Sequence, residues 1–380
     1  MEIVKTNLEL FKATEDSDHW RNYLDYIDDM ILDGFFNAVQ CSLAYLLENT
    51  ESAVPDILPL MEARLELAIP DMVFVPSLEY GSETGFMELI EGIVDDAYKL
   101  SSLIPRIAKH NGMDHYQIEL DDMLDLSEMR HDLMDRVSAV INKAIEQRNQ
   151  FENYSYLWTE NRAEFLRQFL LYNHVLTQEE IENAGEEGVP ECPPTLEQFR
   201  EQMDTYESLY DEIAQLPDVY VFDQWFRLSI RPFKQNLLNV VRKWSLMFKT
   251  HLIDHVTNSL KSLQEFIKVT NSGLGVEVED GDYDGLVSCM GHLLNVRDRT
   301  AMTDEMFEPL KQTIDLLKSY EHEMSEEVHL QLQELPEQWN NVKKQAVMVK
   351  QQVAPLQANE VAIIRRKCTS FDVKQHEFRE

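Results

Sequence analysis

Apolar residues recur at steps of three and four along most of this chain, the spacing that gathers them on one face of an α-helix. The longest such stripe follows Arg231-Pro232-Phe233 and consists of Leu237, Val241, Trp244, Phe248, Leu252, Val256, Leu260, Leu263 and Ile267. At about 1.5 Å per residue, a helix that carries it reaches ~50 Å. The pattern therefore predicts one long helix, with Trp244 and Phe248 in the core that it helps to form.

The same spacing predicts helices in most of the remaining sequence. They are expected over residues 20–47, 86–110, 121–150, 154–176, 195–216, 284–299, 303–334 and 337–380. Pro55 and Pro59 end the first of them, and Pro105 kinks the second. His110-Asn111-Gly112 offers the left-handed conformation in which helices end. A loop is expected over 271–284.

Extended structure is expected at one place only. An element over 60–67 runs into a stretch of β-branched and aromatic residues between Pro70 and Pro76, which predicts at most a short extended segment near 70–78. Twelve glycines and thirteen prolines are few for 380 residues, and a chain of many short strands needs more of both. The expected fold is all-α, an elongated stack of antiparallel helical bundles.

Two short motifs predict helix starts. Thr177 and Glu180 are spaced for a capping box, in which the threonine hydroxyl accepts from a backbone N–H and the glutamate reaches back. Thr195 and Gln198 repeat the motif further along.

Between the two motifs the sequence NAGEEGVPECPP, residues 183–194, predicts a linker. Its glycines, prolines and glutamates leave little to bury. The predicted division is an N-terminal helical bundle region, 1–182, and a C-terminal long-helix bundle region, 195–380.

A formal net charge of −35 bears on the choice of partner. Residues 1–190 carry 38 acidic against 13 basic side chains, and residues 191–380 carry 31 against 21. Such a field repels phosphate backbones and anionic lipids, which argues against nucleic acid and membrane as partners. Basic protein surfaces fit better, although an acidic surface also serves solubility alone.

The sequence also predicts a soluble protein of a reducing, intracellular compartment. Cys41, Cys192, Cys289 and Cys368 are far apart, without C-x-x-C spacing. No run approaches the ~18 apolar residues of a membrane span, and MEIVKTNLEL lacks the pattern of a signal peptide. The final QHEFRE continues a helical pattern that no glycine or proline closes, which predicts a piece of a longer chain.

A search for catalytic motifs yields no site. The chain has no G-x-x-x-x-G-K-[ST] phosphate loop, and Gly273-Leu-Gly275 follows no predicted strand. His251 and His255 have the i, i+4 spacing of metal ligands, but they lack the glutamate of H-E-x-x-H and a third ligand nearby in sequence. The aspartates within 25–29 and 121–125 lack the spacing of a calcium loop. No catalytic residue, cofactor or metal ion is therefore expected.

Large aromatic residues are the remaining candidates for function. An acidic chain lacks the basic groove that a base-stacking platform needs, so these residues are expected to anchor cores. Contact with a partner helix is the alternative. The candidates for these structural or interaction roles are Trp158, Trp225, Trp244, Phe248 and Trp339.

Several strings of the sequence resemble one family. They are LELAIPDMVFVPSL (65–78), ENYSYLWTENRAEFLRQFL (152–170), PPTLEQFREQMDTYESLYDEI (193–213), FDQWFRLSIRPFKQNLLNVVRKWSLMFKTHLIDHV (222–256), FEPLKQTIDLLKSY (307–320) and the stretch over 332–379 that begins LQELPEQWNNVKK. In this order they resemble the N-terminal tail of dynein heavy chains, most of all the β-type heavy chains of ciliary and flagellar outer arms. The resemblance covers nearly the whole chain.

The resemblance implies a function without catalysis in these residues. In that family the tail is a curved stack of helical bundles that joins heavy chains and carries intermediate, light intermediate and light chains. It anchors the complex to the axonemal doublet microtubule, in the cytoskeleton of a cilium or flagellum. The ATPase ring follows further along, so minus-end-directed movement belongs to the parent chain. From the residues alone, an unrelated acidic helical scaffold or tethering protein stays open.

Overall fold

The structure is a computed structural model that describes residues 2–12, 14, 17–51, 59–81, 84–109, 112–184 and 188–379. The pattern of contacts divides the chain into two compact units. The first comprises Met1–Asn161 and Ser208–Lys243, and the second comprises Arg162–Glu207 and Trp244–Glu380. The divisions after Glu207 and Lys243 fall inside helices, so α9 (Leu196–Gln215) and α10 (Arg231–Leu274) contribute residues to both units.

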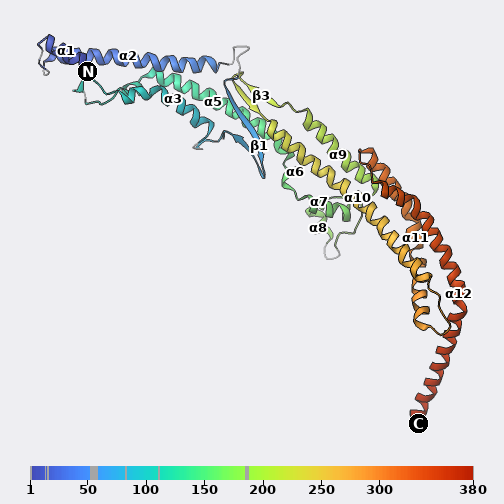
Figure 1. The fold of residues 1–380 in the computed structure, drawn as a ribbon. Helices are drawn as coiled ribbons and strands as arrows, with labels where there is room; N and C mark the ends of the chain where they lie inside the picture. The colour runs from blue at the N-terminus through green and yellow to red at the C-terminus, as the bar shows by residue number, and fades with distance from the viewer. Residues whose placement is uncertain are drawn as a thin grey trace. The chain divides into compact units, whose positions relative to one another are not determined.

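Helices make up most of the first unit, as the sequence predicts. Beside its parts of α9 and α10 it contains α1 (Glu2–Leu10), α2 (Asp18–Asn49), α3 (Phe86–Leu103), α4 (Gln117–Asp121), α5 (Leu124–Gln150), the 3-10 helix η2 (Phe151–Tyr154) and α6 (Tyr156–Thr159). α3 and α5 lie along α2 (Figure 1). α5 buries Leu133, Val137, Val140 and Ala144. The apolar steps over 121–150 thus predicted both this helix and its core-facing side.

The first unit also holds a four-stranded sheet that the sequence did not predict. Its order is β2-β1-β4-β3, and these strands span Asp71–Val75, Met61–Ala68, Phe226–Ser229 and Val219–Phe222 respectively. The extended segment expected near 70–78 is present as β2, and the element over 60–67 is its antiparallel partner β1. β1 also pairs in parallel with β4. The all-helical expectation therefore holds for most of the chain, but the expectation of at most one short extended segment is wrong.

The turn between β3 and β4 explains part of this difference. Its residues Asp223 and Gln224 have φ values of 46° and 63°. Phe222 pairs with Phe226, so the turn has three residues, and its two positive φ values are a conformation that glycine or asparagine usually signals. Asp-Gln does not carry that signal. The other part is distance along the chain, because a local pattern at β1 carries no information about a partner at β4.

A buried aspartate fixes the segment between α3 and α4 to α2. Asp28 is 3% exposed, and it accepts hydrogen bonds from the backbone N–H groups of Ile107 (3.1 Å) and Ala108 (3.0 Å). The Tyr116 hydroxyl donates a third bond at 2.7 Å. Three donors compensate the cost of burying a carboxylate. The guanidinium of Arg106 lies over the Tyr116 ring at 4.9 Å.

Two of the predicted helices in this part of the chain are shorter than expected. The helix predicted over 86–110 ends at Leu103, because Pro105 lies in a β-bridge with His115. The helix predicted over 154–176 is interrupted where Glu160 takes an extended conformation. The predicted breaks at His110-Asn111 and Pro55 lie outside the described residues.

α2 has the length and composition of a membrane span, which the sequence analysis did not expect. An 18-residue window of it reaches a mean hydropathy of 1.4. Helices in soluble bundles pass the same test, so this observation is weak by itself. In the structure α2 carries the buried Asp28 and packs against α3 and α5. These contacts are those of a bundle helix.

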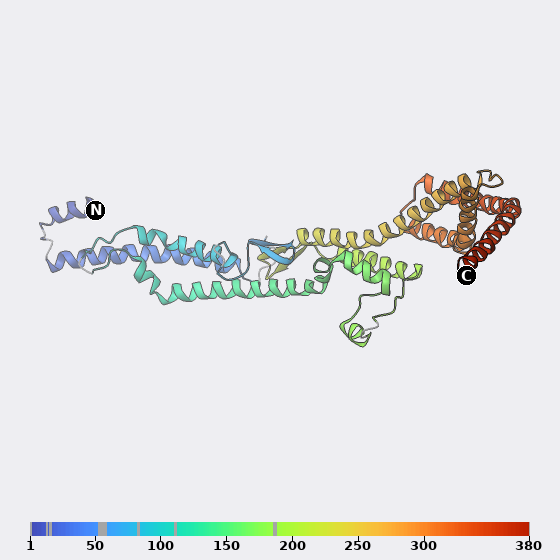
Figure 2. The ribbon, with the colours of Figure 1, turned by 90° about the horizontal axis from the view of Figure 1, so that it is seen from below.

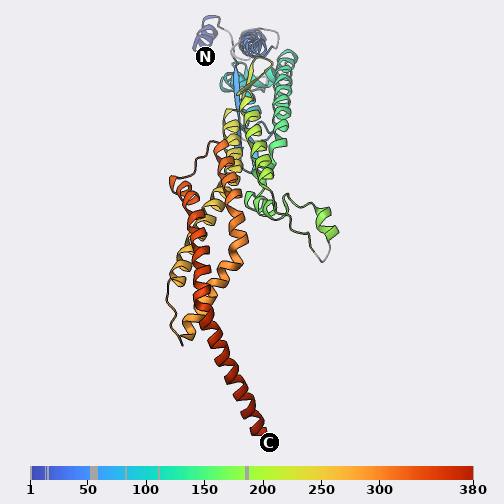
Figure 3. The same cartoon turned by 90° about the vertical axis from the view of Figure 1, so that its right-hand side faces the viewer.

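In the described residues, the second unit is built from helices. It contains α7 (Arg162–Tyr172), α8 (Gln178–Ala184), α11 (Tyr283–Ser319), α12 (Glu326–Arg379) and its parts of α9 and α10. α10 confirms the long helix predicted after Ile230. α11 and α12 pack against each other, and Figure 3 shows the last turns of α12 continuing without another element beside them. Every side chain described after Ile363 is exposed.

Two helices follow α10, where three were predicted. No break occurs near residue 301, where the Thr300 hydroxyl donates to the Val296 carbonyl within α11. Pro336 lies inside α12, in the gap between the helices predicted over 303–334 and 337–380. Its neighbours Leu335 and Trp339 are each 1% exposed, and their packing outweighs the lost backbone bond. The chain instead reverses after Tyr320, at Glu321, whose φ is 58°.

α8 and the segment after it correspond to the predicted linker region. Figure 2 shows α8 standing apart from the long helices of the second unit. Residues 188–195 have no regular secondary structure, and residues 185–187 lie outside the described part of the chain. The linker over 183–194 and the division that it implies stay predictions.

Candidate interaction surfaces

Four of the five aromatic candidates are buried. Trp225 and Trp339 are 1% exposed, and Trp244 and Phe248 are 0% exposed. Trp158 is half-buried, and its indole N–H donates to the Pro70 carbonyl at 2.9 Å. The structure does not bring the five together, because they belong to separate cores.

In the first unit the aromatic candidates are Trp158 and Trp225, and both contact residues at or next to the ends of strands. Trp225 packs edge-on against Phe226 at 5.9 Å, and its carbonyl accepts from the Met61 N–H at 3.1 Å. Trp158 packs edge-on against Phe233, with ring centroids 6.3 Å apart. Both tryptophans therefore fix strand ends and the start of α10 rather than face a ligand.

In the second unit six aromatic rings, five of them buried, form one cluster, hereafter the aromatic cluster. Its members are Phe165, Phe169, Phe199, Tyr206, Trp244 and Phe248, from α7, α9 and α10. Tyr206 stacks on Trp244 at 5.5 Å, and Phe169 meets Phe248 edge-on at 5.4 Å. Mixed stacked and edge-on geometry is favoured between aromatic rings. The expectation that Trp244 and Phe248 are core residues of the long helix is confirmed.

Trp339 ties α12 to its neighbours. Its indole N–H donates to an Asp304 carboxylate oxygen at 2.8 Å, and the Lys343 ammonium donates to the same oxygen at 2.8 Å. The hydrogen bond from Lys343 is the main reason why the pKa of Asp304 lies below its ordinary value. The ring also packs against Phe266 of α10 at 6.1 Å. These contacts are structural.

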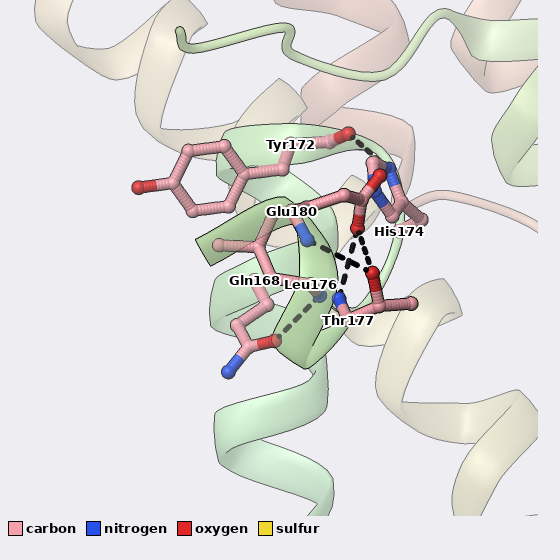
Figure 4. Close-up of polar contacts among 6 residues, drawn as sticks. All are labelled: Gln168, Tyr172, His174, Leu176, Thr177 and Glu180. Atoms are coloured by element: carbon pink, nitrogen blue, oxygen red, sulfur yellow. Dashed lines mark hydrogen bonds and ion pairs between the residues drawn. The ribbon is translucent and has the colours of Figure 1, made fainter. Parts of the chain in front are cut away.

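Figure 4 shows a polar corner where α7 turns into α8. The Glu180 carboxylate accepts from the Thr177 N–H at 2.8 Å and from its hydroxyl at 2.9 Å, and the Glu180 N–H donates to Thr177 Oγ1 at 3.3 Å. The predicted capping box is confirmed. The second box is confirmed too, since the Thr195 N–H donates to Gln198 Oε1 at 2.7 Å.

His174 extends the first capping box. Its Nε2 lies 2.9 Å from Glu180 Oε1, and its Nδ1 lies 2.8 Å from the Tyr172 carbonyl oxygen. Both ring nitrogens face oxygen acceptors, an arrangement that a protonated ring satisfies with its two N–H groups. The Thr177 N–H first, then its hydroxyl and His174, hold the pKa of Glu180 below its ordinary value. The sequence showed the box, but it gave no sign of the histidine.

The paired histidines of α10 line a cavity of about 680 Å³ against α11. Burial lowers the pKa of His251, the neighbouring His255 lowers it further, and Asp254 acts in the opposite direction. His251 stacks on Phe199 at 5.8 Å. In the part of the chain that the structure describes, no three His, Cys, Asp or Glu side chains are grouped to hold a metal ion.

A second hollow, hereafter the α11–α12 groove, has a volume of about 450 Å³. Its lining is apolar with a few cations and amides, and it consists of Met290, Leu293, Leu294, Val296, Arg297, Thr300, Lys343, Ala346, Val347, Lys350, Ala354 and Gln357. Sequence reasoning missed it. Two apolar residues that lie outside the buried stripes of their helices were the sign of it in the sequence. They are Leu294 and Val347, whose side chains are 47% and 58% exposed.

Comparison with known proteins identifies relatives of this chain. No protein-family profile matches the chain. Curated relatives match it from end to end: "Dynein beta chain, ciliary" of Heliocidaris crassispina is 65% identical over 378 residues, and "Dynein axonemal heavy chain 9" of Homo sapiens is 53% identical over 376 residues. The chain is homologous to a segment of axonemal dynein heavy chains.

These dynein heavy chains are far longer than this chain. The two matches cover 100% and 99% of this chain, but 8% of the length of each relative. "Dynein beta chain, flagellar outer arm" of Chlamydomonas reinhardtii is 28% identical over 412 residues, which are 99% of this chain and 9% of that protein. The chain therefore corresponds to one continuous stretch of dynein heavy chains. The resemblance to axonemal dynein heavy chains is confirmed, and the assignment of this segment to their tail stays a prediction.

Proposed function

We propose that this chain is a non-catalytic tail segment of an axonemal dynein heavy chain and serves the assembly of the dynein complex. The observation that carries the proposal is the 65% identity to a ciliary dynein beta chain along the whole chain. Two hollows between helices of the second unit, one of them lined by exposed apolar side chains, support a role in binding partners.

The proposed partners follow from this assignment. They are other heavy chains, the intermediate, light intermediate and light chains, and, through the complex, the axonemal doublet microtubule. The parent complex is an ATP-driven, minus-end-directed motor that moves cilia or flagella. A net charge of −35 favours basic partner surfaces and disfavours nucleic acid and anionic membranes.

Crosslinking within the assembled complex tests the proposal. Axonemes that contain this chain are treated with an amine-reactive crosslinker, and the linked peptides are identified by mass spectrometry. Lys311 and Lys318, both exposed on α11, are expected to link to other dynein subunits. Links confined to this chain and to nucleotide-binding parts of the heavy chain would contradict a role in assembly.

A further inference from the structure

We propose that the α11–α12 groove is a docking site for an acidic amphipathic helix of a partner protein. The proposal deepens the proposed function and rests on it, because it gives the chemistry of one assembly partner. It is carried by the shape, the exposed apolar rim and the charge of the groove.

The groove is held open by contacts at each end. At one end Trp339 and Lys343 of α12 both bind Asp304 of α11. At the other, the Asn359 side chain donates to Asp280, just before α11, at 3.4 Å. These bonds join two antiparallel helices, so the space between them is already formed before a ligand binds. A preformed site spares the ligand part of the cost of ordering the protein.

The dimensions of the groove fit a helix of about four turns. Its α12 wall runs from Lys343 to Gln357, and fourteen steps of about 1.5 Å give ~21 Å. Leu293, Val296 and Ala346 form the less exposed floor, while Leu294 and Val347 stand exposed on opposite walls. This arrangement of a buried floor and apolar rims suits the i, i+3, i+4, i+7 side chains of an amphipathic helix.

The charge of the lining selects an acidic ligand. Arg297, Lys343 and Lys350 line the groove and no carboxylate does, although the chain as a whole carries −35. Lys343 is bound to Asp304. Among the described residues Arg297 pairs with its chain neighbour Asp298, and both side chains are highly exposed, so this pair contributes little. Arg297 and Lys350 can therefore meet carboxylates of an incoming helix.

Other ligands fit less well. Nucleic acid and anionic membranes extend beyond the groove and meet the acidic surface around it within the screening length of about 10 Å, whereas a short helix meets only the lining. A small apolar ligand would use the floor but not the two exposed rims. The remaining alternative is that a second copy of this chain binds in the groove, and the experiments below test it.

Peptide binding to the intact chain tests the groove itself. The probe, hereafter the glutamate peptide, is a fluorescent amphipathic peptide of about 14 residues with leucines on one face and glutamates on the other, and the control peptide has the same residues in an order that leaves no apolar face. Fluorescence anisotropy is expected to show binding of the glutamate peptide alone, weakened by added salt. Equal binding of both peptides, or no binding of either, overturns the proposal.

Matched variants locate the binding. Val347→Asp and Lys350→Glu should each weaken binding of the glutamate peptide at least about tenfold. Met348→Asp and Lys344→Glu alter neighbouring exposed residues of α12 outside the lining, so they should leave affinity unchanged. All four sites are exposed, and thermal melting checks that the variants fold. Equal effects of a variant and its control overturn the proposal.

Two further readouts separate the alternatives. If the chain self-associates and Val347→Asp makes it monomeric in analytical ultracentrifugation, the groove joins copies of the chain and the proposal is wrong. Peptide binding without crosslinks to other dynein subunits would refute the proposed function while supporting the groove. Crosslinks without peptide binding would refute the groove alone.

Discussion

At the scale of single residues, Trp244 and Phe248 show what the buried positions of α10 contribute. Both are 0% exposed within the aromatic cluster. Truncating either to alanine removes a large ring that its neighbours can only partly replace, so the free energy of unfolding should fall by roughly 3–5 kcal/mol. Urea unfolding followed by circular dichroism measures the change.

Leu246 provides the matched control for this prediction. It lies between the two residues on the same helix and is 58% exposed. Leu246→Ala should change the free energy of unfolding by no more than about 0.5 kcal/mol. If the three variants unfold alike, the aromatic cluster does not stabilise the fold.

The capping box at α8 predicts a pH dependence. The hydrogen bonds of Thr177 hold the pKa of Glu180 below its ordinary value. A carboxyl whose pKa is lowered in the folded state contributes stability above its ordinary pKa, and this stability is lost as the pH falls through the lowered pKa. The start of α8 should therefore loosen in acid, as the pH falls from the ordinary pKa of a glutamate through the lowered pKa of Glu180.

Carbon-13 NMR titration of the Glu180 carboxyl tests this prediction. Thr177→Val removes one donor and should raise the pKa of Glu180 towards its ordinary value. Gln178→Ala is the control, because the Gln178 amide donates to Glu182 and not to Glu180. An unchanged pKa of Glu180 in the valine variant would show that the hydroxyl plays no part.

At the scale of elements, the local patterns predicted what local forces decide. α5, α9, α10 and both capping boxes depend on side chains within a few turns of each other, and all of them are confirmed. The sheet depends on β1 meeting β4, far along the chain, and on a turn without glycine. Such pairing depends on tertiary context, which a pattern of neighbours does not record.

The candidate surfaces follow the same division. Burial of Trp244 and Phe248 could be read from their place in a continuous apolar stripe. The α11–α12 groove could be read only in part: Leu294 and Val347 are apolar residues off the buried faces, but the groove also depends on how the two helices pack against each other, which the spacing within each helix does not record. His174 joined the capping box through a turn whose geometry sets its ring beside Glu180, and nothing in the spacing indicated this contact.

The linker predicted over 183–194 should be the interior segment that proteases cut first. α8 buries no residue, and residues 188–195 make no regular structure, so little local structure must open before cleavage. The expected fragments from limited proteolysis with Glu-C end at Glu182 to Glu191 and are identified by mass spectrometry. First cuts inside α5, at Glu128 or Glu146, would contradict the prediction.

At the scale of the whole molecule, the uneven distribution of charge favours basic partners in one region and acidic partners in another. The first half carries most of the acidic excess, whereas residues 343–380 carry eight basic and four acidic side chains. An acidic surface suits basic partners, and the basic lining of the α11–α12 groove suits an acidic one. Opposite preferences on one chain allow two partners to bind without competing for the same surface.

The same charge predicts that the chain does not bind ATP. A nucleotide site needs a cradle of backbone N–H groups and a cation for the phosphates, and the sequence contains no phosphate loop. The field of −35 charges also repels a triphosphate, which lowers its concentration near the surface.

Isothermal titration calorimetry of ATP–magnesium into the chain should give only the heat of dilution. Magnesium chloride alone is the control, because exposed carboxylates bind the cation weakly and release heat of their own. Saturable heat with micromolar affinity that appears with ATP–magnesium but not with magnesium chloride would mean that these residues hold a nucleotide, and the proposal of a non-catalytic tail segment would then fail.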